Sequence, residues 1–105
     1  MITIQPRRDD AIQAGWVAYS GRVPGMRDAY IRACDGWTVE AVCSGDAVIG
    51  ALFSKAGVIH LGIVPEWRGR WASRRVLREM LERGTKTEIG PGDDAEWLGR
   101  IRDIV

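Results

Sequence analysis

The chain has 105 residues, a formal net charge of +1 and an apolar fraction of 46%. This length allows one domain (1–105) with one modest hydrophobic core. The near-neutral charge gives no global argument for nucleic acid, a membrane surface or an acidic partner. No apolar run reaches the roughly 18 residues of a membrane span, and no leader precedes one, so we expect a cytoplasmic protein without membrane contact.

The N-terminal part predicts one strand and two helices. Met1–Pro6 alternates apolar and polar residues, as a short strand does. Asp9 and Asp10 form an N-cap signal before an apolar helical pattern that reaches Tyr19. After a break at 20–25, Met26–Cys34 predicts the second helix.

Three strands are expected next. Trp37–Cys43 and Ala47–Ser54 are joined by Ser44–Asp46, a tight turn that predicts a hairpin. Val58–Val64 is a further apolar run, and it ends at Pro65 because proline cannot donate to a sheet ladder.

The C-terminal part predicts a helix, a strand and a last short helix. Ala72–Arg83 has the strongest helical pattern. Its expected buried stripe is Val76, Leu77, Met80 and Leu81. Thr85–Ile89 reads as a strand, and Asp93 and Asp94 precede the last helix. The order β-α-α-β-β-β-α-β-α predicts an α/β (α+β) fold. We expect a mixed central sheet with helices on both faces and a parallel pair through a right-handed crossover.

The two cysteines, Cys34 and Cys43, form no disulfide framework, and no Cys/His spacing fits a metal site. Cys34 closes an apolar helical pattern and Cys43 lies in a strand-like run. We therefore interpret both as buried free thiols.

The segment after Gly57 carries the most information on function. A buried strand ends at Val64, a short loop contains Arg68, Gly69 and Arg70, and a helix starts at once. This arrangement points backbone N–H groups and a positive helix end out of the sheet edge, where phosphates bind well. Five arginines in the loop and the first helical turns suit a polyphosphate ligand. They are Arg68, Arg70, Arg74, Arg75 and Arg78.

The sequence Val64-Pro65-Glu66-Trp67-Arg68-Gly69-Arg70 resembles the strand-to-helix motif V-x-P-E-x-R-G-x-G-x-G/A of the GNAT superfamily of acyl-CoA-dependent N-acetyltransferases. The expected order of elements agrees with that family as well. The resemblance implies that acetyl-CoA binds as co-substrate. It also implies that the strand ends in a bulge where the main chain of Ile63 and Val64 pairs with the pantetheine arm. The backbone groups implied to hold the pyrophosphate are those of Arg68, Gly69, Arg70, Trp71, Ala72 and Ser73. The Arg-Gly-Arg-Trp-Ala-Ser variant further resembles short bacteriophage-encoded GNAT-like proteins, which would place the chain in a host cytoplasm or a virion.

The chain departs from the family pattern at several points. Trp71 stands where the second glycine belongs and Ser73 where the final Gly or Ala belongs, although glycine lets the backbone approach a phosphate closely. The indole could block the phosphates, cover the cofactor or pack on the first helix. Leu98 takes the place of the tyrosine acid, and the usual C-terminal strand hairpin is lacking before Val105. We therefore expect an open sheet edge that pairs with a second copy or a partner chain.

Two residues are candidate general bases. His60, on the strand that leads into the motif, could accept a proton from an amine through water, or it could simply face solvent or bond within the sheet. Glu40 could act from the neighbouring strand, or it could be an outward-facing carboxylate. On the following helix the arginines could pair with Glu79 and Glu82 instead of a ligand. Nucleic acid is disfavoured because no exposed aromatics are interleaved with these arginines.

Two functions remain open from the sequence. In the first, a small-molecule or protein amine attacks the thioester of bound acetyl-CoA. In the second, the chain is a catalytically inactive GNAT-fold binding or structural module, such as a phage assembly component. Trp71, Leu98 and the lacking hairpin favour the second function, whereas the intact Arg-Gly-Arg loop favours the first.

Overall fold

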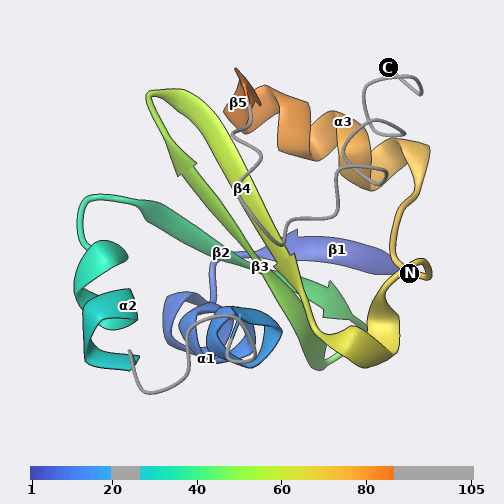
Figure 1. The fold of residues 1–105 in the computed structure, drawn as a ribbon. Helices are drawn as coiled ribbons and strands as arrows, with labels where there is room; N and C mark the ends of the chain where they lie inside the picture. Colours follow the sequence, from blue (N-terminus) through green and yellow to red (C-terminus); the bar gives the residue numbers. More distant parts are fainter. Residues whose placement is uncertain (20–26, 87–105) are drawn as a thin grey trace.

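The computed structural model describes residues 1–19 and 27–86, which form a five-stranded sheet with three helices packed on it (Figure 1). The elements in chain order are β1 (Ile2–Gln5), α1 (Arg8–Tyr19), α2 (Arg27–Ala33), β2 (Thr38–Ser44), β3 (Ala47–Lys55), β4 (Gly57–Ile63), the 3-10 turn η1 (Pro65–Trp67), α3 (Arg74–Arg83) and β5 (Gly84–Lys86). The expected α+β class is confirmed. The expected last helix lies outside the described residues, and so does the end of the strand expected at Thr85–Ile89.

The strands are arranged in sequence order, β1-β2-β3-β4-β5. β1 to β4 pair antiparallel with their neighbours, and β5 pairs parallel with β4. The sheet is therefore mixed, and the predicted parallel pair across α3 is confirmed. Among the described residues no strand pairs with the outer edge of β1. The pairing of an open sheet edge with a second copy or a partner chain stays a prediction.

Both hairpins use backbone conformations that their turn residues allow. Between β2 and β3, Gly45 has a φ of 60°, which glycine adopts without steric cost. Between β3 and β4, Ala56 and Gly57 have φ values of 50° and 80°. Two successive positive φ values are typical of the type I′ turn, whose twist matches that of the strands.

Small residues bring α1 close to one face of the sheet. The helix begins at Arg8, so Asp9 and Asp10 lie in its first turn and are not the N-cap that the sequence predicts. There they face the positive end of the helix dipole. The buried residues of α1 are Ala11, Ala14, Gly15 and Ala18. α1 contacts β2, β3 and β4. The core on this face joins Ala11 to Cys34, Val39, Ala41, Cys43, Ala51 and Phe53.

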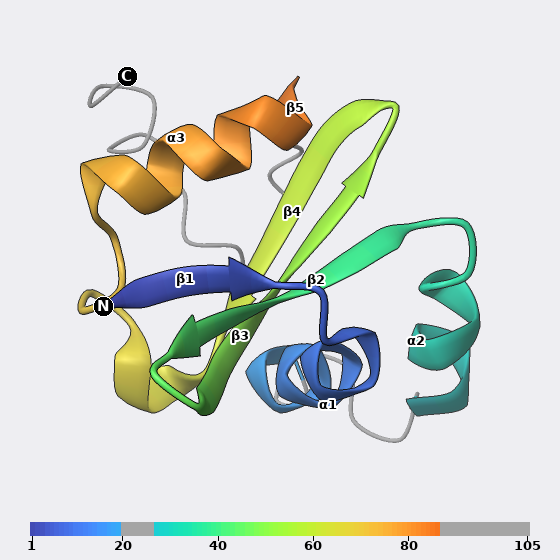
Figure 2. The ribbon, with the colours of Figure 1, turned by 180° about the vertical axis from the view of Figure 1, so that it is seen from behind.

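α3 covers the other face, as the two opposite views show (Figures 1 and 2). Val76, Leu77 and Met80 are buried as predicted, whereas Leu81 is only half-buried. They pack with side chains of β2, β3 and β4, namely Val42, Ile49, Leu52, Ile59 and Ile63. The expected placement of helices on both faces is confirmed.

We predict that Gly50→Ala lowers the free energy of unfolding by about 2 kcal/mol. A Cβ at Gly50 would collide with the backbone oxygen of Gly62 and would lie 2.7 Å from Cδ1 of Ile63. Because the first of these atoms belongs to a neighbouring strand, the sheet itself must move. Urea denaturation measures the change, with Ala47→Ser at an exposed position of the same strand as the control. Equal stability of the two variants would contradict the prediction.

Candidate functional site

The hydrogen bonds between β3 and β4 continue to Val64, one residue past the end of β4. The chain then turns sharply. The Val64 N–H donates to the Ile49 carbonyl at 2.9 Å. Pro65 then starts the 3-10 turn, where a missing N–H costs nothing. The Arg68 N–H donates to the Pro65 carbonyl at 3.3 Å, and the Arg70 N–H donates to that of Trp67 at 3.1 Å. These bonds use two of the backbone groups that the resemblance assigns to the pyrophosphate.

The end of β4 is regular. Its pairing with β3 has no shift from Val58 to Ile63, so the bulge expected at the end of this strand is not found there. The register shifts of the described sheet lie instead at Val42/Cys43, between β2 and β3, and at Gly57/Val58, between β4 and β5. Hydrogen-bonded and non-bonded pairs alternate along an antiparallel ladder, so the bonded Val64 leaves the N–H and C=O of Ile63 pointing away from β3.

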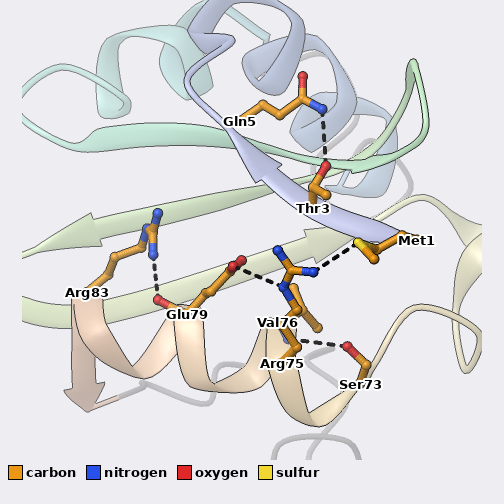
Figure 3. Close-up of polar contacts among 8 residues, drawn as sticks. All are labelled: Met1, Thr3, Gln5, Ser73, Arg75, Val76, Glu79 and Arg83. Carbon is orange, nitrogen blue, oxygen red and sulfur yellow. Dashed lines mark hydrogen bonds and ion pairs between the residues drawn. The ribbon is translucent and has the colours of Figure 1, made fainter.

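Ser73 caps α3, which begins at Arg74 and not at Ala72 as predicted. Ser73 has an extended backbone (φ −134°, ψ 161°), and its hydroxyl accepts from the Val76 N–H at 3.2 Å (Figure 3). Its carbonyl accepts from the Leu77 N–H at 3.0 Å. The Ser73 side chain therefore caps the helix, while its own N–H has no acceptor among residues 1–19 and 27–86.

Several backbone N–H groups between the loop and the first turn of α3 point to no acceptor among the described residues. They belong to Gly69, Ala72, Ser73, Arg74 and Arg75. Gly69 has a φ of 80°, a left-handed conformation in which successive N–H groups can converge on one anion. The sequence named Arg74 and Arg75 as candidates for their charge, but not for their backbone N–H groups. The signal for them is Ser73 as the N-cap, because capping satisfies only one of the four orphan N–H groups of a helix.

Trp71 lies inside the protein. It is 3% exposed and belongs to the core cluster that includes Val76 and Leu77. The alternative that its indole packs on the first helix is wrong, because α1 lies on the opposite face of the sheet. The buried indole anchors the loop to the core at the position where the motif of the GNAT superfamily has a glycine.

Arg68 and Arg70 behave differently. Arg68 turns toward the protein: its Nε donates to the Ile63 carbonyl at 3.3 Å, and its Nη2 donates to the Ala18 carbonyl at 3.2 Å. Arg70 is exposed, and its guanidinium lies 5.1 Å from the centroid of the Trp67 ring. Both residues are exposed, but of the two only Arg68 bonds two carbonyls that lie far apart along the chain.

The arginines of α3 form an exposed positive surface. Arg74 and Arg78 are exposed. Arg75 lies 3.7 Å from the Glu79 carboxylate and donates to Sδ of Met1 at 3.1 Å (Figure 3). The alternative pairing with Glu79 is thus seen for Arg75, although an exposed pair of this length contributes little to stability.

Glu40 is paired and mostly buried, not outward-facing. Its carboxylate receives two hydrogen bonds from Arg83, Nε to Oε1 at 2.5 Å and Nη2 to Oε2 at 3.0 Å. The side chains are 16% and 27% exposed. The hydrogen bond to Glu40 raises the pKa of Arg83, against the opposing effect of burial. Arg83 also donates to the Glu79 carbonyl (Figure 3), so the pair ties β2 to the end of α3.

His60 lies on the opposite face of the sheet from Glu40. It pairs in register with Phe53, whereas Glu40 pairs with Leu52, and these two β3 residues belong to opposite core clusters. The His60 ring is half-buried and meets the Trp37 ring edge-on at 5.2 Å. It stands three residues before Ile63, which is about 10 Å along a strand. The structure does not bring the two candidate bases together.

In the described part of the chain, the other chemistry-bearing residues suggest no second site. Cys34 and Cys43 are buried free thiols, as expected, and burial raises the pKa of both. Within residues 1–19 and 27–86, no group of His, Cys, Asp and Glu could hold a metal ion. No helix in the same ranges is long and apolar enough to cross a membrane.

Comparison with protein-family models, curated proteins and solved structures finds no match to this chain.

We predict that Glu40→Gln lowers the free energy of unfolding by about 2 kcal/mol, because it leaves the partly buried Arg83 without its counter-ion. The double variant with Arg83→Met should recover most of the loss, since it removes both charges. Chemical denaturation of the single and double variants measures this. Arg75→Met is the control on the same helix, with an expected change below about 0.5 kcal/mol. A Glu40→Gln protein as stable as the parent would refute the interpretation.

Proposed function

We propose that this chain binds acetyl-CoA at the end of β4, along the loop 68–73 and at the start of α3. The observation that carries the proposal is the set of backbone N–H groups between Gly69 and Arg75 that find no acceptor among the described residues. Five such donors next to the positive end of a helix dipole suit a pyrophosphate. The resemblance of the Val64–Arg70 motif to the GNAT superfamily supports the same ligand.

The outer edge of β4 supports a place for the pantetheine arm. In the described part of the chain β5 pairs with β4 only at Gly57 and Val58, the first two residues of β4. At the other end of β4, the Ile63 N–H points away from β3. An extended arm that carries carbonyl oxygens can accept from this N–H as an added strand would. The thioester would then lie near the end of β4, and the phosphates of the same ligand would lie at the loop 68–73.

The exposed arginines favour a ligand with several negative charges. Arg70 flanks the open N–H groups, and Arg74 and Arg78 lie one turn apart on the surface of α3. Exposed positive groups raise the local concentration of an anionic ligand and speed its association.

If the bound thioester reacts, the nitrogen of an amine attacks its carbonyl carbon. The C–S bond breaks, and the products are an amide and free CoA once the amine proton has left and the thiolate has gained one. His60 is the candidate proton acceptor. At about 10 Å along the strand from Ile63 it would act through water rather than directly. The acceptor class is a primary amine on a small molecule or a protein.

We predict that acetyl-CoA binds with micromolar affinity and that Arg70→Glu weakens binding at least about tenfold, because the exposed charge beside the pyrophosphate is reversed. Isothermal titration calorimetry measures both. Arg32→Glu, an exposed position on α2, is the matched charge reversal and should leave the affinity unchanged. Absence of binding to the folded protein at millimolar acetyl-CoA would sink the proposal.

A second candidate function is a binding or structural module without catalysis. One observation favours it: Glu40 is held by Arg83 on the face opposite His60, so these two candidate bases cannot act together on one thioester. The unbroken end of β4 adds to this, since the strand lacks the bulge implied for the active family.

Release of free thiol from acetyl-CoA, measured with a panel of primary amines and a lysine-containing peptide, separates the two candidates. For a transferase we expect release above the spontaneous rate, reduced about a hundredfold or more by His60→Ala. His60→Gln serves as the variant that keeps hydrogen bonding but not basicity. Binding without thiol release would support the non-catalytic module, and release untouched by either variant would exclude His60 as the base.

A further inference from the structure

We propose that Arg68 is a positioning residue of this site: it holds the loop in its binding shape and does not itself contact the phosphates. The inference rests on the proposed acetyl-CoA site. The sequence predicts that all five arginines suit a polyphosphate ligand. The present proposal differs, because Arg68 would bond the protein and would not contact the ligand.

The contacts of Arg68 lead to this assignment. Two different nitrogens of its guanidinium donate to two carbonyls, those of Ile63 and Ala18, and both hydrogen bonds are partly buried. Ala18 lies in the last turn of α1, where helix carbonyls have no partner within the helix. Arg68 therefore ties together the end of β4, the start of the loop and the end of α1.

This bridge also decides which groups the end of β4 can offer. The C=O and N–H of Ile63 both point away from β3, and Arg68 takes the C=O. The N–H of Ile63 and the open N–H groups of the loop are all donors. The site thus selects an arm that presents acceptors, such as amide, thioester and phosphate oxygens. An arm that must donate meets an Ile63 carbonyl that already accepts from Arg68.

Arg70 provides the matched contrast, two residues away in the same loop. It approaches the Glu66 carbonyl only at 3.5 Å and otherwise stacks on Trp67. A lysine keeps the charge of either arginine, but it cannot donate from two fixed, separate nitrogens to two carbonyls. The two Arg→Lys substitutions therefore distinguish an arginine that positions the loop from one that contributes only its positive charge.

We expect Arg68→Lys to weaken acetyl-CoA binding at least about tenfold, with the salt dependence of the affinity unchanged. Arg70→Lys keeps the charge and should weaken binding less than Arg68→Lys does, and Arg70→Ala should show a shallower salt dependence. Calorimetry is run well below the unfolding temperature of every variant, so that lost stability alone cannot change the affinity. The proposal is overturned if Arg68→Lys binds as the parent does, or if Arg68→Ala flattens the salt dependence as Arg70→Ala does.

Amide hydrogen exchange tests the bridge without any ligand. Arg68→Lys should speed exchange of the Arg70 N–H, which is bonded to the Trp67 carbonyl, while the Ala41 and Ala51 amides in the sheet centre stay protected. Unchanged exchange in the loop overturns the positioning role whether or not acetyl-CoA binds. If the parent protein fails to bind acetyl-CoA but loop exchange rises in Arg68→Lys, the proposed function fails while the bridge stands.

Discussion

The close contact between α1 and the sheet is the constraint on which the candidate site depends. Among residues 8–18 of α1 the buried ones are alanine and glycine, and the sheet meets them with Ala41, Ala51 and Phe53. Because the buried α1 residues are small, the helix lies close to the sheet, and the Ala18 carbonyl comes within reach of Arg68. Only then can Arg68 bond both Ala18 and Ile63. A bulkier helix face would move α1 outward and remove one of the two anchors.

The loop achieves with side chains what glycines achieve in the motif it resembles. Trp71 anchors it in the core, Ser73 ends it as the cap of α3, and Arg68 fastens it to α1. Only Gly69 uses the conformational freedom of glycine. A loop held at three points loses little entropy when a ligand binds, so its open N–H groups are preorganised. It also adapts less to a ligand of another shape.

Local chemistry in the sequence predicted most of the fold. Turn residues such as Gly45 and the apolar stripe of α3 mark their elements within a few neighbours. What it missed depends on partners far apart along the chain. The bonds of Glu40 to Arg83 and of Arg68 to Ala18 join residues that share no pattern. The sequence does not predict the direction of the Trp71 side chain either, since an indole in a loop can face the core or the solvent.

The register of β1 carries a consequence for the order of folding. β2, β3 and β4 form a meander whose strands are joined by tight turns, so their contacts close short loops. β1 instead pairs Ile2 with Ser44, across the whole of α1 and α2. Closing so long a segment costs more chain entropy and slows the search for partners. The meander can therefore serve as the nucleus, with the N-terminal strand docking late onto a preformed template.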